Sequence, residues 1–276
     1  MLRPKNNKTK PRIKHRPFLK WAGGKFRLTD DLNRVFPKRK QCLIEPFVGA
    51  GAVFLNSHFE RYILADINPD LINLFNIVKD NVDAYIEACK PIFFAENANT
   101  AEYYYAQRDA FNQSTDPFDR SVLFLYLNRF GFNGLCRYNS KNEFNVPFGA
   151  YKTHYFPEDE LRYFAHKAQS AVFLCADFQQ TFELADKHSV IYCDPPYAPL
   201  PQDTNFTGYA GNAFGLEHQK NLAECAKKAQ KEKQISVVIS NHDTKFTREI
   251  YKGAKFKRVK VQRSISQSSE KRVKVK

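Results

Sequence analysis

Residues 42–67 read CLIEPFVGAGAVFLNSHFERYILADI, and this stretch decides the fold. It begins and ends with short aliphatic runs, 42–45 and 61–67, which are typical of buried strands in a parallel sheet. Between them, the glycine-containing turn EPFVGAG leads into the apolar run AVFL, which favours a helix. A strand, a glycine-rich turn, a helix and a second strand form the opening unit of an open α/β fold.

The same short apolar runs, bounded by turn residues, recur along the rest of the chain. They predict further strands at 172–178, 190–194, 235–241 and 256–265. The amphipathic stretch 216–229 has the pattern of a helix that covers such a sheet. The predicted fold class is therefore α/β, with helices packed on a mainly parallel sheet.

After the second strand the alternation stops. The dipeptides at 68–69 and 116–117, Asn-Pro and Asp-Pro, each have the pattern of a helix N-cap followed by proline in the first turn. Apolar residues then recur at helical spacing, at 71, 74, 75 and 78 and again at 122, 123, 125 and 126. Residues 69–157 are therefore predicted to form a mainly helical insertion between two strands of the sheet.

Charge is unevenly distributed along the chain, whose net charge is +14. Residues 1–40 contain 14 Lys and Arg against two acids, and residues 252–276 contain ten against one. Within the insertion, 69–119 carries three basic and nine acidic residues, whereas 120–155 carries five and one. Basic termini can bind a nucleic acid through its phosphates, or they can be solvated tails. If the insertion contacts nucleic acid, we expect its second half to do so.

Composition argues against several classes of protein. No apolar run approaches the roughly 20 residues that a membrane span needs, and the basic N-terminus is not followed by the apolar segment of a secretory signal. The six cysteines are never closer than 18 residues apart, so neither a CxxC zinc site nor a dense disulfide framework is indicated. These features predict a cytoplasmic protein with reduced thiols and no metal centre.

The turn EPFVGAG, residues 45–51, is the first candidate ligand site. Its glycines let the backbone pass close to a ligand, and the following helix offers free N–H groups. The next strand leads to Asp66, whose carboxylate can accept hydrogen bonds from a ribose diol. Such turns are common in α/β proteins. This one lacks the third glycine of the dinucleotide fingerprint, which disfavours a nucleotide-dependent oxidoreductase.

A second motif, FLKWAGGK, spans residues 18–25. Its Gly-Gly-Lys end suggests a phosphate-binding loop, but the Walker pattern needs a glycine where Leu19 stands and a hydroxyl residue where Phe26 stands. We therefore reject that interpretation. A lysine in a tight glycine turn beside an aromatic residue, here Lys25 and Trp21, can instead bind the carboxylate of an amino-acid group. A plain surface turn is the alternative.

The third motif is Asp194-Pro195-Pro196-Tyr197, at the end of a predicted strand. Open α/β sheets bind ligands at the carboxyl ends of strands, and two prolines expose carbonyls that have no place in the sheet ladder. An aromatic amine such as adenine N6 is a poor nucleophile, because its lone pair is delocalised into the ring. If Asp194 and the Pro195 carbonyl accept its two N–H bonds, the nitrogen becomes pyramidal and can attack a methyl group in line. Tyr197 can then stack on a flipped base, and a turn without function is the alternative.

These three motifs, with the insertion between the last two, resemble those of the Dam-type DNA adenine-N6 methyltransferases from about residue 17 to about residue 266. The resemblance implies the Rossmann-like sheet of S-adenosylmethionine-dependent methyltransferases. It implies methyl transfer from S-adenosylmethionine to N6 of adenine in double-stranded DNA, usually in GATC, with residues 194–197 as the catalytic block. It also implies that the cofactor is surrounded by Trp21, Lys25, Glu45, Pro46, Phe47, Gly49, Gly51, Asp66, Asp177, Phe178 and Asp194.

Within the insertion, 128–138 and 144–148 are two short extended runs around a polar turn, the pattern of a β-hairpin. A two-stranded ribbon fits the major groove, where Arg137 can pair with guanine and Leu135 and Pro147 can pack on a thymine methyl. Phe132 can wedge into the space that a flipped base leaves, and a hairpin that only packs on the helices is the alternative. Completed by the resemblance, the predicted DNA-binding set is Lys20, Arg129, Phe132, Asn133, Leu135, Arg137, Pro147 and Tyr151.

The predicted organisation is a basic N-terminal extension at 1–16, a catalytic domain at 17–68 and 158–276, and a target-recognition insertion at 69–157. The extension stands before the usual start of the family. The chain also ends in the strand-like VKVK, where the family tends to continue, which suggests a truncation. Residues 199–214 are rich in Gly, Asn and Pro and predict a mobile loop over the site. A monomer associated with the nucleoid is expected.

Three alternatives stay open. One is a transferase that acts on cytosine N4 or on adenine in RNA, although cytosine-N4 enzymes favour serine where Asp194 stands and the hairpin favours duplex DNA. Another is a non-catalytic DNA-binding protein on the same fold, and the third is a nucleotide-dependent oxidoreductase. Cytosine-C5 chemistry needs a Pro-Cys step, which the sequence lacks. Thermal stabilisation by S-adenosylmethionine and not by NAD would separate a methyltransferase from an oxidoreductase.

Overall fold

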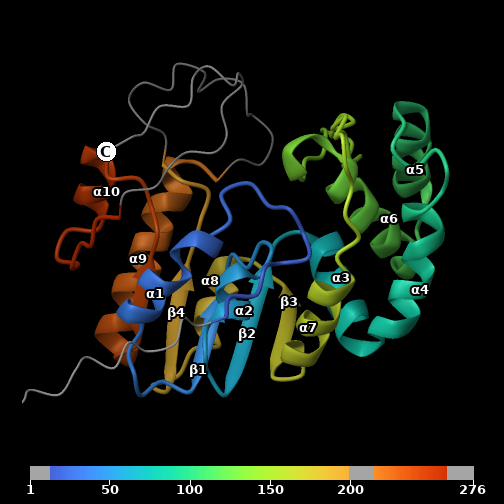
Figure 1. Cartoon of the computed structure of the whole chain (residues 1–276). Coiled ribbons are helices and arrows are strands. Elements are labelled where there is room, and N and C mark those ends of the chain that lie inside the picture. The colour runs from blue at the N-terminus through green and yellow to red at the C-terminus, as the bar shows by residue number, and fades with distance from the viewer. Residues whose placement is uncertain (1–12, 199–213, 260–276) are drawn as a thin grey trace, which may run out of the picture.

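The computed structural model describes residues 13–198 and 214–259 (Figure 1). Five parallel strands form a sheet in the order β3-β2-β1-β4-β5. The strands are β1 (Cys42–Glu45), β2 (Arg61–Asp66), β3 (Ala171–Cys175), β4 (Ser189–Cys193) and β5 (Ser236–Ile239). The chain adds β2 and β3 on one side of β1 and then β4 and β5 on the other. The carboxyl ends of β1 and β4 therefore flank the switch point, where such sheets bind ligands.

The sheet confirms the predicted α/β class and five of the six predicted strands, with shifts at their ends. The strand predicted at 172–178 ends earlier, at Cys175, because Asp177 is the N-cap of helix α8 (Phe178–Glu183). Its carboxylate accepts a hydrogen bond from the backbone N–H of Gln179, and this local cap removes the backbone from the strand. The strand predicted at 256–265 is wrong for residues 256–259, and its remainder lies outside the described residues.

Helices pack around the sheet and beyond one of its edges. The segment before β1, the shorter connections and the C-terminal part contribute η1 (Phe26–Leu28), α1 (Thr29–Val35), α2 (Ala52–Asn56), α8, α9 (Leu216–Lys233) and α10 (Lys245–Ile250). The segment between β2 and β3 contributes α3 (Pro69–Asp80), α4 (Val82–Phe93), α5 (Ala101–Gln113), α6 (Pro117–Phe130), η2 (Phe132–Gly134) and α7 (Glu158–Ala168). Figure 1 shows α4, α5 and α6 beyond the β3 edge of the sheet.

The predicted helix starts are confirmed in detail. The side chain of Asn68 accepts hydrogen bonds from the backbone of Asp70 and Leu71, and proline occupies the first turn of α3. The side chain of Asp116 caps α6 in the same way. Each cap satisfies N–H groups that a helix start otherwise leaves without a partner. The helix predicted at 216–229 is the first part of α9.

One hydrophobic cluster joins the sheet to the helices that follow β2. It contains aromatic residues from both, among them Phe18, Phe75, Tyr126 and Phe164, and the ring of Phe75 lies 4.8 Å from that of Phe164. Burial of rings of this size is a large stabilising contribution. The sheet and the helices that follow β2 therefore share one hydrophobic core. This core does not mark where an inserted domain begins or ends, so the insertion at 69–157 remains a prediction.

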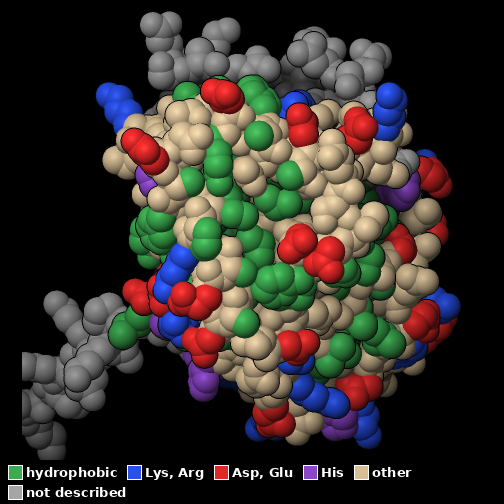
Figure 2. Space-filling model, turned by 90° about the vertical axis from the view of Figure 1, so that its right-hand side faces the viewer, with side chains coloured by type: hydrophobic (Ala, Val, Ile, Leu, Met, Phe, Trp, Pro, Cys, Tyr) green, Lys and Arg blue, Asp and Glu red, His purple; other side chains and the backbone are tan. Residues whose placement is uncertain are grey.

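The outer face of α4–α6 lacks the concentrated positive charge that would attract a polyanion. Figure 2 shows this face with acidic side chains scattered among apolar ones and with Lys and Arg toward its margins. This agrees with the excess of acids in 69–119. Phosphates would be repelled there, so this face is a poor surface for DNA. Among the described helices, none combines the length and the apolar character that crossing a membrane requires.

Candidate active site at the switch point of the sheet

Three carboxylates lie at or just after the carboxyl ends of strands. Glu45 ends β1, Asp66 ends β2 and Asp194 directly follows β4. Because these strands are parallel neighbours, their ends lie along one edge of the sheet on both sides of the switch point. The structure thus brings together residues from the glycine turn and from the Asp-Pro-Pro-Tyr motif, which the sequence could only list separately.

The glycine turn after β1 lies against Trp21 and Asp66. Gly49 and Gly51 have φ angles of +48° and +73°, a region that residues with a side chain rarely adopt. A Cβ atom at Gly49 would lie 2.9 Å from Nε1 of Trp21, so the close approach also requires glycine. The N–H of Gly49 donates a hydrogen bond of 3.1 Å to Oδ2 of Asp66. The FLKWAGGK motif and the glycine turn therefore meet beside the end of β2.

Lys25 connects the FLKWAGGK motif to Asp194. Its Nζ lies 2.7 Å from Oδ2 of Asp194 and donates a hydrogen bond of 2.6 Å to the carbonyl of Gly23. The same Nζ is 4.8 Å from the ring centroid of Tyr197. Lys25 is only 9% exposed, so the ion pair is poorly screened by solvent. In the structure the partner of Lys25 is thus a protein carboxylate, and a ligand carboxylate would have to share it.

Two buried carboxylate oxygens have no hydrogen-bond partner among the described residues, Oε1 of Glu45 and Oδ1 of Asp194. Burial raises the pKa of Glu45 well above its usual range, and the charge of Asp194 raises this pKa further. Burial also raises the pKa of Asp194, while Lys25 and then the hydroxyl of Tyr197 oppose that rise. Buried acceptors without donors are costly. The site is therefore suited to a ligand that brings N–H groups or positive charge.

The remaining predicted cofactor residues lie at the same edge of the sheet. Burial raises the pKa of Asp66, although backbone N–H groups, first that of Asn68, oppose the rise. The rings of Phe47 and Phe178 stack with their centroids 5.7 Å apart. Pro46 is buried beside Phe47, whereas Asp177 is occupied by its role as the cap of α8. The site therefore combines a half-buried ring, Phe47, stacked on the buried Phe178, with a hydrogen-bonded carboxylate at the end of β2.

Sequence reasoning missed two kinds of residue here. Ile67 directly follows Asp66 and is 76% exposed, which places an apolar side chain at the rim of the site. Its signal was an aliphatic residue just past the end of a strand. Gln219 and Asn241 contact the turn that contains the two prolines. The signal for Asn241 was a polar triplet, Ser-Asn-His, directly after β5. Gln219 carried none, because glutamine near a helix start is ordinary.

The predicted β-hairpin exists only in an irregular form. Two isolated antiparallel bridges, Gly131 with Phe148 and Tyr138 with Phe144, replace regular strands. Residues 132–134 form the helical turn η2, in which Asn133 has a φ angle of 54°. A left-handed residue interrupts a strand, so the predicted hairpin forms as isolated bridges and not as a continuous two-stranded ribbon. The polar turn at 139–143 is confirmed, since the N–H of Asn139 donates to the carbonyl of Glu143.

Most of the predicted DNA-binding residues form two groups that combine exposed and half-buried side chains. In the first, Nζ of Lys20 donates a hydrogen bond of 2.6 Å to the carbonyl of Arg129 and lies 3.7 Å from the ring centroid of Tyr151. The hydroxyl of Tyr151 accepts a hydrogen bond from the N–H of Asn133, and Phe132 beside it is 46% exposed. These residues, which come from three separate segments, therefore make one surface.

The second group surrounds Arg137, whose guanidinium is exposed but not free. Its Nε donates to Oδ1 of Asn145 at 2.7 Å, and its Nη2 donates to the backbone carbonyl of Asn145 at 3.0 Å. Pro147 is exposed and Leu135 is half-buried nearby in the chain. Arg129 differs from the rest of the predicted set. It is turned inward, where burial lowers its pKa and its Nε has no described partner.

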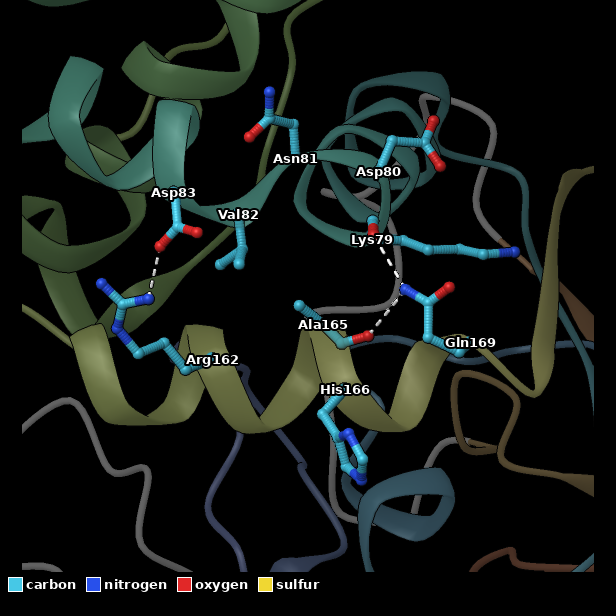
Figure 3. A pocket seen from close by; sticks show the side chains of 9 residues that line it. All are labelled: Lys79, Asp80, Asn81, Val82, Asp83, Arg162, Ala165, His166 and Gln169. Carbon is cyan, nitrogen blue, oxygen red and sulfur yellow. Dashed lines mark hydrogen bonds and ion pairs between the residues drawn. The ribbon is translucent and has the colours of Figure 1, made fainter.

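One pocket lies away from this site, and its polar groups do not call for a ligand. It has a volume of about 420 Å³ and lies between the α3–α4 junction and α7 (Figure 3). Arg162 pairs with Asp83 at 2.6 Å, and the side-chain amide of Gln169 donates to the carbonyls of Lys79 and Ala165. Its polar groups are thus largely paired with one another. Among the described residues, no group of three or more His, Cys, Asp or Glu could hold a metal ion.

A parallel sheet with this site at its switch point has the Rossmann-like fold of the S-adenosylmethionine-dependent methyltransferases. The family model of the D12 class N6 adenine-specific DNA methyltransferases matches residues 21–265. The chain belongs to this family and is an adenine-specific DNA methyltransferase.

Relatives support the same assignment. The chain is 82% identical to the DNA adenine methylase of Haemophilus influenzae over 276 residues, which is all of this chain and 96% of the relative. It is 59% identical to the DNA adenine methylase of Escherichia coli K12 over 262 residues, or 95% of this chain and 93% of the relative. The DNA adenine methylase of Vibrio cholerae is 58% identical over 262 residues, with 95% and 94% covered.

Proposed function

We propose that this methyltransferase transfers a methyl group from S-adenosylmethionine to N6 of adenine in the GATC sequence of double-stranded DNA, after flipping the adenine out of the duplex. The observation that carries the proposal is the pair of acceptors at the end of β4. Oδ1 of the buried Asp194 has no partner, and no described residue donates a hydrogen bond to the carbonyl of Pro195. An amine with two N–H bonds is the ligand that satisfies both.

The residues at the switch point fit S-adenosylmethionine. When bound, this cofactor supplies a methyl group activated by a positively charged sulfur. The unpaired oxygen of Glu45 suits an ammonium group, Asp66 suits a ribose diol, and the stacked rings of Phe47 and Phe178 suit a purine. The left-handed Gly49 lets the turn lie directly against Trp21 and Asp66, so that these proposed cofactor residues are held together. The proposed cofactor set is Trp21, Lys25, Glu45, Pro46, Phe47, Gly49, Gly51, Asp66, Asp177, Phe178 and Asp194.

In the proposed mechanism, the chain activates the amine and excludes water from it. Asp194 and the Pro195 carbonyl accept the two N–H bonds and free the lone pair of the nitrogen for attack. Burial raises the pKa of Asp194 and Lys25 opposes that rise, which favours the carboxylate form that accepts and does not donate. Pro196 restricts the backbone beside them, and Tyr197 stacks on the flipped base.

For DNA recognition we propose the two groups of the segment that follows β2. Arg137 would pair with guanine, and Leu135 and Pro147 would contact the thymine methyl. Phe132 would fill the gap that the flipped adenine leaves. Lys20, Asn133 and Tyr151 support the proposal because they share one surface with Phe132. Arg129 would act indirectly, because its carbonyl holds the ammonium of Lys20. All proposed residues belong to one chain, so we propose that a monomer acts.

The pKa of Lys20 makes DNA binding depend on pH. Burial, and then the charge of Arg129, lower this pKa from 10.5 to about 8. A lowered lysine pKa means that the ammonium is present below about pH 8 and is lost as the pH rises through that value. We expect the affinity for a GATC duplex, measured with S-adenosylhomocysteine at pH 7 and pH 9, to fall by roughly tenfold. Lys20→Arg stays charged and serves as the control; an equal fall in both proteins would assign the effect to other groups.

The proposed function is tested by transfer of labelled methyl from S-adenosylmethionine to short duplexes that contain GATC or a variant with one base changed. We expect label on N6 of the GATC adenine and little on the variant. Label on cytosine N4, or on RNA with the same sequence, would replace the proposed acceptor. Equal label on both duplexes would remove GATC from the proposal. In parallel, S-adenosylmethionine should raise the melting temperature and NAD should not.

A further inference from the structure

The turn that carries the proposed acceptors has few backbone donors with which to hold itself in place. Residues 194–198, here called the proline turn, include Pro195 and Pro196, which have no N–H to donate. The turn also leaves the sheet at Cys193, whose carbonyl accepts the last ladder hydrogen bond from the N–H of Ser240 at 2.9 Å. An active site needs its acceptors fixed to within a fraction of an ångström. Other parts of the chain must therefore supply the support.

Gln219 and Asn241 supply it. The side-chain amide of Gln219, in the first turn of α9, donates a hydrogen bond of 2.7 Å to the carbonyl of Pro196. Oδ1 of Asn241, just after β5, accepts a hydrogen bond of 3.0 Å from the N–H of Ala198. The two amides are joined, because Nδ2 of Asn241 donates to Oε1 of Gln219 at 2.8 Å. The backbone on both sides of Tyr197 is thus held by one bridge between α9 and β5.

The burial of this bridge makes it unlike an ordinary surface contact. Gln219 is 1% exposed and Ala198 is 2% exposed, so water does not replace these hydrogen bonds at low cost. Oδ1 of Asn241 also accepts from the N–H of His242 at 2.9 Å. Nδ1 of His242 lies 2.7 Å from the carbonyl of Ala198, and its ring packs edge-on against Tyr197, 4.8 Å between centroids. Tyr197 is therefore supported through its backbone and through its ring.

We propose that Gln219 and Asn241 are positioning residues of methyl transfer, which act by holding the proline turn. Holding the carbonyl of Pro196 fixes the peptide plane between Pro196 and Tyr197. Because the ring of Pro196 restricts its φ angle, this also limits how the preceding peptide can turn, and the Pro195 carbonyl stays free to meet the amine. Neither amide needs to touch the amine or the methyl donor. The inference rests on the proposed function, since it assumes that the proline turn binds the target amine.

The test compares two substitutions of buried amides by apolar side chains of similar size. Gln219→Met removes the bridge. Asn56→Leu, at the end of α2, is the matched control, because Asn56 is 7% exposed and makes three hydrogen bonds to the backbone of His15 and Ala52. Each protein is assayed for its single-turnover rate constant on a GATC duplex, for its affinities for S-adenosylhomocysteine and DNA, and for its melting temperature.

We expect Gln219→Met to lower the single-turnover rate constant by about 10- to 100-fold, because small misplacements of reacting groups have effects of this size. Both affinities should change by less than about threefold. The control should lose melting temperature but keep its rate constant. Fluorescence of 2-aminopurine at the target position, which reports flipping without methyl transfer, should stay close to that of the unaltered protein. A rate constant within about threefold of the unaltered value would overturn the proposal, and so would equal losses in both variants.

A second variant keeps the test decisive if Gln219→Met does not fold. Asn241→Leu removes the acceptor for the N–H of Ala198 and the donor to Oε1 of Gln219, and it brings no group that could take up a proton. Its rate constant should fall in the same way, and an unchanged rate constant would also overturn the proposal. The unaltered protein in the same assay separates the two ideas. If it does not methylate GATC adenine, the proposed function fails, whereas a ratio near one between variant and unaltered protein refutes only the role of the bridge.

Discussion

Asp194→Ala is expected to lower the rate constant of methyl transfer by about 10³-fold or more. The carboxylate lies at the end of β4 with Oδ2 paired to Lys25 and Oδ1 without a partner. Its removal leaves the target amine with only the Pro195 carbonyl as an acceptor, so the lone pair of the nitrogen stays in the ring. It also leaves the buried ammonium of Lys25 unpaired, which disfavours a positively charged methyl donor nearby. The measurement is single-turnover methyl transfer on a GATC duplex.

The affinity for DNA should be largely unchanged in this variant, because the proposed recognition surface lies in a different segment. Asp186→Ala is the matched control. Asp186 also pairs with a basic residue, Arg61 at 3.4 Å, but it precedes β4 and so lies at the opposite end of that strand from Asp194. Its rate constant should match that of the unaltered protein. Substantial turnover by Asp194→Ala would show that the carboxylate does not accept from the amine.

Arg137→Ala is expected to reduce discrimination at one guanine of the recognition sequence by about 1–3 kcal/mol, or roughly 5- to 150-fold. In the structure the guanidinium is already oriented by two hydrogen bonds to Asn145. Its Nη1 is not used in either bond, so part of the guanidinium remains available for O6 and N7 of guanine. The measurement is kcat/KM on a GATC duplex and on duplexes changed at each position. The preference should relax at one guanine only.

Lys141→Ala serves as the comparison for this experiment. Lys141 is exposed in the polar turn that follows Arg137, and its loss should weaken binding to all duplexes alike, as removal of a phosphate contact does. If Arg137→Ala shows the same uniform loss, then Arg137 binds the backbone of DNA and does not read a base. The proposed source of sequence specificity would then have to be sought among Asn133, Leu135 and Pro147.

Much of the fold followed from short-range patterns. The run Cys42–Glu45 was predicted as β1 because four apolar or buried residues are bounded by turn residues. The starts of α3 and α6 were predicted because Asn68 and Asp116 stand directly before proline. Such signals are local, since a cap or a buried strand requires only its own neighbours to form. The three chemical motifs were recognisable for the same reason.

Other features depend on contacts that compete with the local sequence pattern, and the sequence alone does not show which of the two prevails. The strand predicted through 178 ends at Cys175, because the cap at Asp177 competes for the backbone. The hairpin was predicted from two extended runs, but the left-handed Asn133 and the docking of Tyr151 on η2 shape it instead. Arg129 belongs to the predicted DNA-binding set through the family resemblance, and the fold leaves its side chain half-buried, which the sequence does not show.

The sequence by itself determined the class of fold, the family and the set of chemical groups, because these are written in periodicity, caps and contiguous motifs. Only the tertiary structure decided which of those groups meet. Lys25 pairs with Asp194, and Gln219 and Asn241 hold the proline turn. These partners are far apart along the chain, and a parallel sheet brings them together by collecting the carboxyl ends of its strands at one edge. Contacts of that kind have no period or spacing in the sequence, so they become visible only when the sheet has formed.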